Sequence, residues 1–472
     1  MIEMILFWIV ILSIPATLVC GSVFFAARSA PRARYDEVPR SRLVRGVVLA
    51  SFGLAVMAFF AWSTHEDQPY DDFGTAVTVL AGVIAGALLI LGLGPVIAWL
   101  LGVLGRSASP LPPAIRPAVR PMADKPARIA AGVTTTMAAT AVAVAVVILS
   151  VAVTAKARAD YRPVARLGAL VVEGFSPERA AAVREAVVQE FSGAPVVQNN
   201  SRRERGYFTV ETADHSFLQE IHIGDQALLH YLTGDPSTPY DQKTVVVLAA
   251  GGETQDSMVI RYERSLSDPS TSVKTVPAVT VRPAEPRVGS VFIPAKIMED
   301  FGFHLESNQL IIDPSLHRTS AIEEERLSRR LGATARVQVE RGYHAPTGWQ
   351  DFVAVVLLIA LAGALTTTRS AASRRILRRV GGGSTAALRY FVACRAAFGA
   401  ALGAGIGAVA GCVIGLLLAW PMTAPIGWDV PPRVPFETPW LLIAAFVVAL
   451  PVLAAMIAGV WAAVPGRREL SP

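Results

Sequence analysis

The sequence predicts a polytopic α-helical membrane protein with seven transmembrane helices and one α+β extracytoplasmic domain between helices four and five. Three observations predict this fold: the composition, the long uncharged stretches and the uneven placement of arginine. The chain is 53% hydrophobic and only 17% charged, whereas soluble domains carry about 25% charged residues. This composition excludes a soluble enzyme and a disordered chain, and the length of the apolar stretches excludes an outer-membrane barrel.

Seven stretches contain no Asp, Glu, Lys or Arg. A helix that spans a bilayer needs about 17–25 mostly apolar residues. The seven stretches are residues 4–27, 46–64, 73–105, 129–155, 352–368, 396–428 and 438–466. Each is long enough to be one transmembrane helix.

The basic residues predict the orientation of these helices. The chain has a net charge of +6, but residues 155–350 hold 22 Lys and Arg against 25 Asp and Glu. Outside that segment, all basic residues except Arg433 lie in regions 28–45, 106–128, 369–395 and 467–468. Cytoplasmic loops are enriched in Lys and Arg. We therefore expect these regions in the cytoplasm, with the N-terminus outside and the C-terminus inside, and nucleic acid is not needed to explain the charge.

Two membrane blocks surround one outer domain in this interpretation. The expected parts are a first membrane block of three helices (1–105), a Pro-rich basic cytoplasmic connector (106–128), helix four (129–155), the extracytoplasmic α+β domain (156–350) and a second block with helices five to seven (351–472). Both blocks follow one plan: a span, an Arg-rich loop, a span, a short outer loop and a returning span. Parallel internal repeats of this kind are common in transporters.

The outer segment is predicted to mix strands and helices. Helices are expected over 177–192 after a cap at Ser176, over 294–301, and over 321–332 after a cap at Thr319 or Ser320. Residues 268–287 are rich in Pro, Ser and Thr and predict an extended loop. Strand-like runs rich in Val, Ile, Thr and Tyr occupy 168–173, 207–211, 244–249, 258–262, 309–312 and 335–340.

Glycine recurs every four residues in the sixth predicted span. The positions are Gly399, Gly403, Gly407, Gly411 and Gly415. Small residues on one helix face let two transmembrane helices approach closely. The pattern predicts a helix-packing seam, and both a static seam and one that slides are compatible with it.

The loop before this span has an ordered basic face. Arg374, Arg375, Arg378 and Arg379 fall on one side of a short helix, Val380 adds to an apolar edge, and Gly381, Gly382, Gly383 and Ser384 follow as a helix-ending turn. A loop that only sets topology needs the charge but not this order. The pattern therefore favours docking to a cytoplasmic partner.

Catalytic motifs are absent from the sequence. The run Gly381–Thr385 lacks the lysine of a phosphate-binding loop, and neither HExxH nor GxSxG occurs. The closest histidines are seven and eight residues apart, which is not the close spacing of zinc ligands. Arg395 lies at the predicted cytoplasmic edge of its span and is expected to snorkel. We expect a non-enzymatic chain with no cofactor or metal of its own, and a membrane-anchored hydrolase is disfavoured.

Several of these motifs resemble the FtsX-like (MacB-type) permease domain of ABC transporters. They are RRILRRVGGGSTAALR (374–389), the Gly-periodic span ending GLLLAW (415–420) and the last span ending VWAAVPGRREL (460–470). VERGY (339–343) and VFIPAKIMEDFGF (291–303) resemble the outer domain of actinobacterial members with two permease repeats. The first repeat, 1–105, matches only in plan and would be incomplete.

The resemblance implies the transmembrane permease subunit of a bacterial ABC transporter in the plasma membrane. A separate cytoplasmic ATPase subunit would bind ATP and Mg²⁺ and dock on Arg374–Ser384. Its hydrolysis would move the outer domain and drive export or extraction of a lipid, lipoprotein, peptide or drug-like amphiphile. The chain would pair with itself or with a sister permease. The alternative is a mechanotransmitting or sensory membrane protein that regulates a cell-envelope partner.

Overall fold

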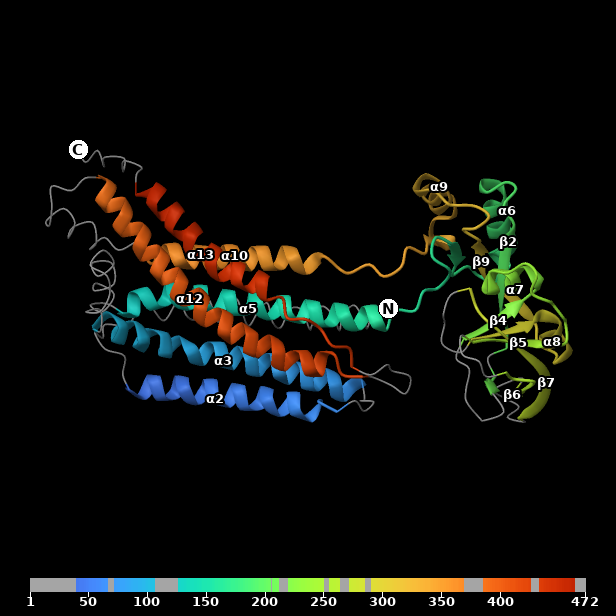
Figure 1. Cartoon of the computed structure of the whole chain (residues 1–472), viewed down its shortest axis with the longest axis horizontal. Coiled ribbons are helices and arrows are strands. Elements are labelled where there is room, and N and C mark those ends of the chain that lie inside the picture. The colour runs from blue at the N-terminus through green and yellow to red at the C-terminus, as the bar shows by residue number, and fades with distance from the viewer. Residues whose placement is uncertain are drawn as a thin grey trace. The chain divides into compact units, whose positions relative to one another are not determined.

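The computed structural model in Figure 1 describes residues 40–66, 72–106, 126–204, 206–211, 220–249, 254–263, 271–284, 290–368, 385–425 and 433–462. The chain divides into two compact units. One, the membrane unit, lies within Met1–Tyr161 and Ala345–Pro472, and the other, the sheet unit, is Arg162–His344. Each unit is described by itself.

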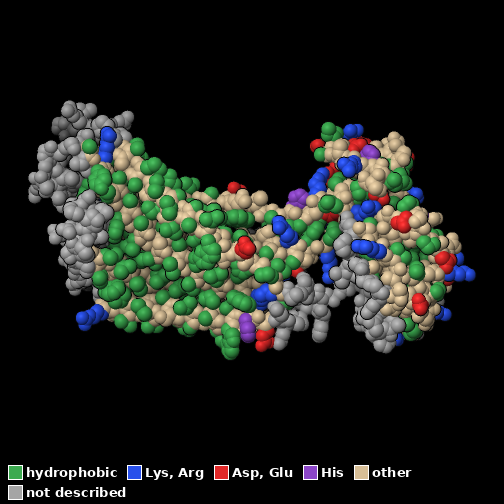
Figure 2. Space-filling view, viewed as in Figure 1, with side chains coloured by type: hydrophobic (Ala, Val, Ile, Leu, Met, Phe, Trp, Pro, Cys, Tyr) green, Lys and Arg blue, Asp and Glu red, His purple; other side chains and the backbone are tan. Residues whose placement is uncertain are grey.

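The described part of the membrane unit contains six helices that are long and apolar enough to cross a membrane. They are α2 (Arg40–Ser63), α3 (Asp72–Arg106), α5 (Pro126–Ala159), α10 (Gly348–Thr366), α12 (Thr385–Met422) and α13 (Trp440–Trp461). The visible face of this bundle is mostly hydrophobic, while charged side chains gather on the sheet unit and toward the helix ends (Figure 2). A polytopic helical membrane protein is thus supported. The seventh predicted span, 4–27, lies outside the described residues.

Helix α5 is the most buried of the six and packs against α12, α10 and α3. Its Val133, Met137 and Ala141 are fully buried in a core shared with α3 and α12. Helices α2 and α3 form a close hairpin, since a Cβ placed on Gly53 would lie 2.5 Å from the Ala85 carbonyl oxygen. Glycine at such positions permits the close approach of two helices.

The described residues of the sheet unit form one ten-stranded mixed sheet, in the order β10-β1-β9-β2-β4-β8-β5-β7-β6-β3. The strands are β1 (Leu170–Glu173), β2 (Val196–Arg202), β3 (Phe208–Glu211), β4 (Glu220–Gly224), β5 (Val245–Leu248), β6 (Ser257–Tyr262), β7 (Ser272–Val281), β8 (Ser290–Pro294), β9 (Leu305–Ile312) and β10 (Arg336–Val339). The β4–β8 and β5–β7 pairs are parallel, and the other described pairs are antiparallel.

The part of this unit that the structure describes also has four short α-helices: α6 (Ala180–Glu190), α7 (Gln226–Thr233), α8 (Ala295–Asp300) and α9 (Ala321–Leu331). Side chains alternate across β1, as expected for a strand buried on both faces. Leu170 and Val172 enter the core with α6 and α9, whereas Val171 enters the core with α7. The two helical layers therefore enclose the β10-β1-β9-β2 end of the sheet.

The six predicted strand runs are confirmed, but the sequence interpretation missed β2, β4, β7 and β8. The predicted loop 268–287 is wrong for Ser272–Val281, which form β7. Residues of β7 before Ala278 pair with β6 and not with β5, so Pro277 occupies an edge position where its missing N–H costs little. Ser176 also differs from expectation: its side chain makes no capping bond, because the first turn after it is the 3₁₀ turn Pro177–Arg179.

Candidate functional site

The predicted coupling loop, Arg374–Ser384, lies outside the described residues, which resume at Thr385. The structure describes the two helices on either side of it in the chain: α10 ends at Thr366 and α12 begins at Thr385. The candidate site is therefore built from α5, α10 and α12, and from the residues that join their far ends.

The glycines of α12 lie against α5. A Cβ on Gly403 would be 2.9 Å from the Val133 carbonyl oxygen, and one on Gly411 would be 2.5 Å from that of Ala141. Each glycine in the run faces two α5 residues: Gly403 faces Val133 and Thr136, Gly407 faces Met137 and Thr140, Gly411 faces Ala141 and Val144, and Gly415 faces Ala145 and Ile148. Residue numbers rise together on both helices, so α5 and α12 run parallel.

Two other glycines of α12 are in a different environment. A Cβ on Gly399 would meet Thr367 Cγ2 at 3.4 Å and Val133 Cγ2 at 3.7 Å, which are ordinary van der Waals distances. A Cβ on Gly405 would meet nothing within 4 Å. Four of the five predicted seam glycines are therefore in very tight contact with α5, and Gly399 is not.

Helix α10 also packs against α5, beside α12. The Thr136 hydroxyl lies 2.9 Å from the Ala360 carbonyl oxygen of α10 and 3.1 Å from the Gly132 carbonyl oxygen of its own helix, and these two acceptors share its single proton. A Cβ on Gly132 would lie 2.7 Å from the Gly363 carbonyl oxygen. The helix before the sheet unit and the helix after it are thus in direct contact.

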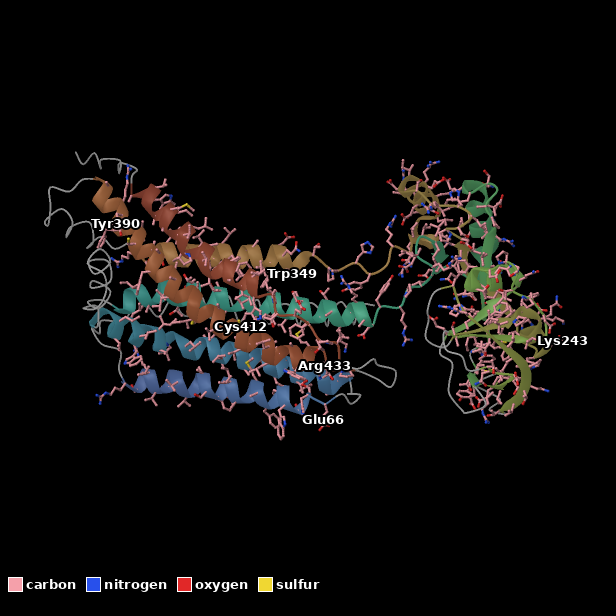
Figure 3. All side chains as sticks on the ribbon, in the orientation of Figure 1. Glu66, Lys243, Trp349, Tyr390, Cys412 and Arg433 are labelled. Carbon is pink, nitrogen blue, oxygen red and sulfur yellow. The ribbon has the colours of Figure 1, made fainter. Side chains whose placement is uncertain are left out.

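Arg433 joins the two membrane blocks at one end of the bundle. Its guanidinium donates to the Trp420 carbonyl oxygen at 2.7 Å, to Thr423 Oγ1 at 2.9 Å and to the Thr64 carbonyl oxygen. It also lies 4.7 Å from the centroid of the Trp420 ring, a cation–π contact. Arg433 and Glu66 lie at one end of the bundle and Tyr390 at the other (Figure 3).

Lys156, in the last turn of α5, makes a second contact at the Arg433 end. Its ammonium donates to the carbonyl oxygen of Ala424, two residues beyond α12. Neither role was predicted, although Arg433 stood out in the sequence as the one basic residue outside the Arg-rich regions and the 155–350 segment. The contact of Lys156 could not be predicted, because its partner is a backbone carbonyl oxygen, and every residue has one whatever its side chain.

The prediction that Arg395 snorkels to the membrane surface is wrong. Its side chain is only 4% exposed, so it is buried among the helices instead of snorkelling to the surface. The reason is the length of α12, which begins at Thr385 and places Arg395 three turns inside a helix expected to start at 396.

Glu340 clamps the two segments through which the chain enters and leaves the sheet unit. Its carboxylate accepts the Val164 N–H at 3.1 Å and the Gly342 N–H at 2.8 Å, and its side chain is buried. Its backbone pairs with Ala169 and Gly168 at 2.9 and 2.7 Å. Gly342 has φ +78°, a left-handed conformation that favours glycine. The VERGY motif is therefore a structural clamp.

No described residues form a group of three or more His, Cys, Asp or Glu side chains that could hold a metal ion. The shortest acid–histidine contact given for these residues, Glu204 Oε1 to His304 Nδ1 at 2.7 Å, has a strongly exposed histidine. The contacts described above pack helices against one another and join segments that are distant in the chain. No protein-family model and no curated protein matches this sequence.

Proposed function

We propose that this chain is the transmembrane permease subunit of a bacterial plasma-membrane ABC transporter, of the FtsX-like (MacB-type) family. A separate ATPase subunit binds ATP and Mg²⁺, and the chain converts its cycle into movement of the sheet unit. That movement exports or extracts a lipid, lipoprotein, peptide or drug-like amphiphile. The protein works as a pair, with itself or with a sister permease.

One observation carries this proposal. The sheet unit ends at His344 and α10 begins at Gly348, while the other end of α10 leads after Thr366 into the basic coupling loop. A single helix therefore lies between the predicted docking loop and the sheet unit in the chain, and only three residues separate this helix from the sheet unit. A helix transmits axial displacement well because its backbone hydrogen bonds lie along its axis.

The contacts of α5 support the same interpretation. Thr136 and Gly132 hold α5 against α10, and Glu340 holds together the chain segments that follow α5 and precede α10. Force applied at either helix is thus shared by both connections to the sheet unit. A binding protein with no moving part would not need this double attachment.

The charge distribution supports the orientation within this proposal. Arg40, Arg42 and Arg45 begin α2 at the end of the bundle opposite Thr64 and Arg433. Under the positive-inside rule the Arg-rich loops face the cytoplasm and the Arg433 end faces outward, with the N-terminus outside and the C-terminus inside.

The test is co-purification of the full chain with an ABC ATPase from its own cell. Arg378→Glu with Arg379→Glu should abolish capture of the ATPase and its stimulated ATP hydrolysis, because both substitutions reverse charge on the docking face. The control is Arg116→Glu with Arg120→Glu, which makes the same charge change in the connector and should retain both. Undiminished capture by the 378/379 variant would refute the assigned loop. Capture of a cell-envelope enzyme without an ATPase would favour the sensory alternative.

A further inference from the structure

We propose that α12 slides along α5 by one four-residue step, between the register seen here and a second register displaced toward the C-terminal end of α12. The step corresponds to about 6 Å, because an α-helix rises about 1.5 Å per residue. One-turn ratchets of packed elements are a known form of conformational switching. The proposal deepens the proposed function, since α12 directly follows the coupling loop.

The seam has the same period on both helices. On α12 the glycines are spaced by four, and on α5 the residues that contact them also advance by four, from Val133 and Thr136 to Ala145 and Ile148. A displacement of α12 by four residues toward its C-terminal end therefore places Gly399, Gly403, Gly407 and Gly411 opposite the four α5 pairs that now face Gly403 to Gly415. The contact surface therefore repeats every four residues, and the same α5 side chains can pack against α12 in either register.

Gly399 gives the displacement a direction. Four α5 pairs are now opposed by Gly403 to Gly415, while Gly399 is one step outside this tight contact. A step toward the C-terminal end of α12 brings Gly399 opposite Val133 and Thr136, so all four pairs still face glycine. The opposite step would place Ala419 against Ala145 and Ile148, where a Cβ has no room.

Helix α3 permits the same step from another side. Leu418 of α12 packs on Gly82 and Ile414 packs on Gly86, so both helices again have a four-residue spacing. After the step, Ile414 would take the place of Leu418 and Ala410 that of Ile414. Both replacements are apolar and no larger than the residues they replace, so the contacts at Gly82 and Gly86 do not block the movement.

Thr140 shows that the present register leaves one polar group unpaired. Its side chain is fully buried at the seam, and a Cβ on Gly407 would lie 2.9 Å from its Cβ. Its hydroxyl has no hydrogen-bond partner among the described residues, whereas Thr136, one turn earlier, has two. A buried polar group without a partner disfavours the state that contains it. In the displaced register Gly403 takes the place of Gly407, so Thr140 again faces a glycine, and this group does not tie α12 to either register.

Lys156, which lies outside the glycine seam, binds a backbone carbonyl oxygen just beyond α12 in the present register. Its ammonium holds the Ala424 carbonyl oxygen, and the carbonyl one four-residue step earlier is that of Trp420, now bound by Arg433. In the displaced register Trp420 occupies the position of Ala424, and Lys156 can take its carbonyl. The same lysine can thus hold either register.

Thiol cross-linking of the full chain in membranes tests the two registers without any ATPase, so its failure is distinguishable from failure of the proposed function. The three native cysteines are first replaced by serine or alanine. Lys156→Cys with Ala424→Cys reports the present register, and Lys156→Cys with Trp420→Cys reports the displaced one. A short bifunctional methanethiosulfonate reagent is expected to link both pairs.

Gly399→Ala makes the test decisive. Its added Cβ fits the present register but would clash with α5 in the displaced one. The rate of cross-linking between positions 156 and 420 should therefore fall by about tenfold or more, while the rate between positions 156 and 424 stays unchanged. Gly405→Ala, which points into open space, is the matched control and should change neither rate. Absence of the 156/420 link, or equal rates in the two alanine variants, would overturn the proposal. Loss of both links in Gly399→Ala would also overturn it, because residue 399 would then already be inside the tight seam.

Discussion

Arg433 donates a hydrogen bond to the carbonyl oxygen of Thr64, which lies 369 residues earlier in the chain. Thr64 follows α2 of the first membrane block, and Arg433 precedes α13 of the second. This contact, with the packing of Leu418 on Gly82, makes the two blocks one bundle. The first block is therefore more than a sequence remnant: it is part of the folded structure that surrounds α12.

Arg433→Gln should destabilise the membrane unit by about 2–3 kcal/mol, because hydrogen bonds made by a charged group contribute about 1.5–3 kcal/mol. Thermal unfolding in detergent measures this. Arg433→Lys should recover part of the loss, since a lysine reaches fewer acceptors and stacks less well on Trp420. Arg318→Gln, an exposed arginine, is the control and should leave the midpoint unchanged. An unchanged midpoint in Arg433→Gln would show that the contact does not stabilise the bundle.

Glu340→Ala should loosen the connection between the sheet unit and its two neighbouring helices. The N–H groups of Val164 and Gly342 would lose their acceptor, and each buried unpaired group costs about 1–3 kcal/mol. Limited proteolysis after Arg162 or Arg166 should become faster. Glu306→Ala removes a carboxylate from an exposed pair with Arg203 and should have little effect. Equal cleavage rates in the two variants would contradict the clamp.

The stability of the sheet unit should depend on pH through Glu323. The backbone N–H of Ser320 and then its hydroxyl bind the Glu323 carboxylate and lower its pKa. A lowered folded-state pKa adds stability that is present above the unfolded value, about 4.3, and is lost as the pH falls through the folded value. Glu323→Ala should therefore destabilise by about 0.3–1 kcal/mol at pH 7 and by less near pH 3. Urea unfolding at both pH values measures this, and a loss that grows on acidification would contradict it.

Sequence patterns predicted the parts of this fold that depend on local chemistry. Uncharged stretches located the six described spans, and the cap expected at Thr319 or Ser320 is found at Ser320, which forms a capping box with Glu323 at the start of α9. Six strands rich in Val, Ile, Thr and Tyr were found in the same way, but β4, β7 and β8 were missed although they also carry an amphipathic or aliphatic pattern. The β2 strand was missed because it contains Gln198, Asn199 and Asn200, residues that favour turns in isolation. It is a strand because β9 pairs with it along its length.

The functional interpretation was predictable only in part. The glycine spacing indicated a seam, but not that its partner is α5 or that Gly399 is outside the tight contact. Thr140 and Lys156 drew no attention because their significance depends on which groups lie opposite them. Tertiary contacts of this kind, between residues far apart in the chain, have no local signature in a single sequence.

Gly411→Ala should destabilise the bundle, in contrast to Gly405→Ala on the same helix. A Cβ at Gly411 would lie 2.5 Å from the Ala141 carbonyl oxygen, closer than real contacts allow, so the two backbones must separate. Overpacking of this kind costs about 1–3 kcal/mol, whereas Gly405→Ala should be neutral or slightly stabilising because alanine is the better helix former. Thermal unfolding of both variants in the same detergent measures the difference. Because lipid offers no hydrophobic drive to hold the helices together, α12 has little to compensate the lost contact with α5. Equal midpoints would mean that the seam is loose enough to absorb a methyl group.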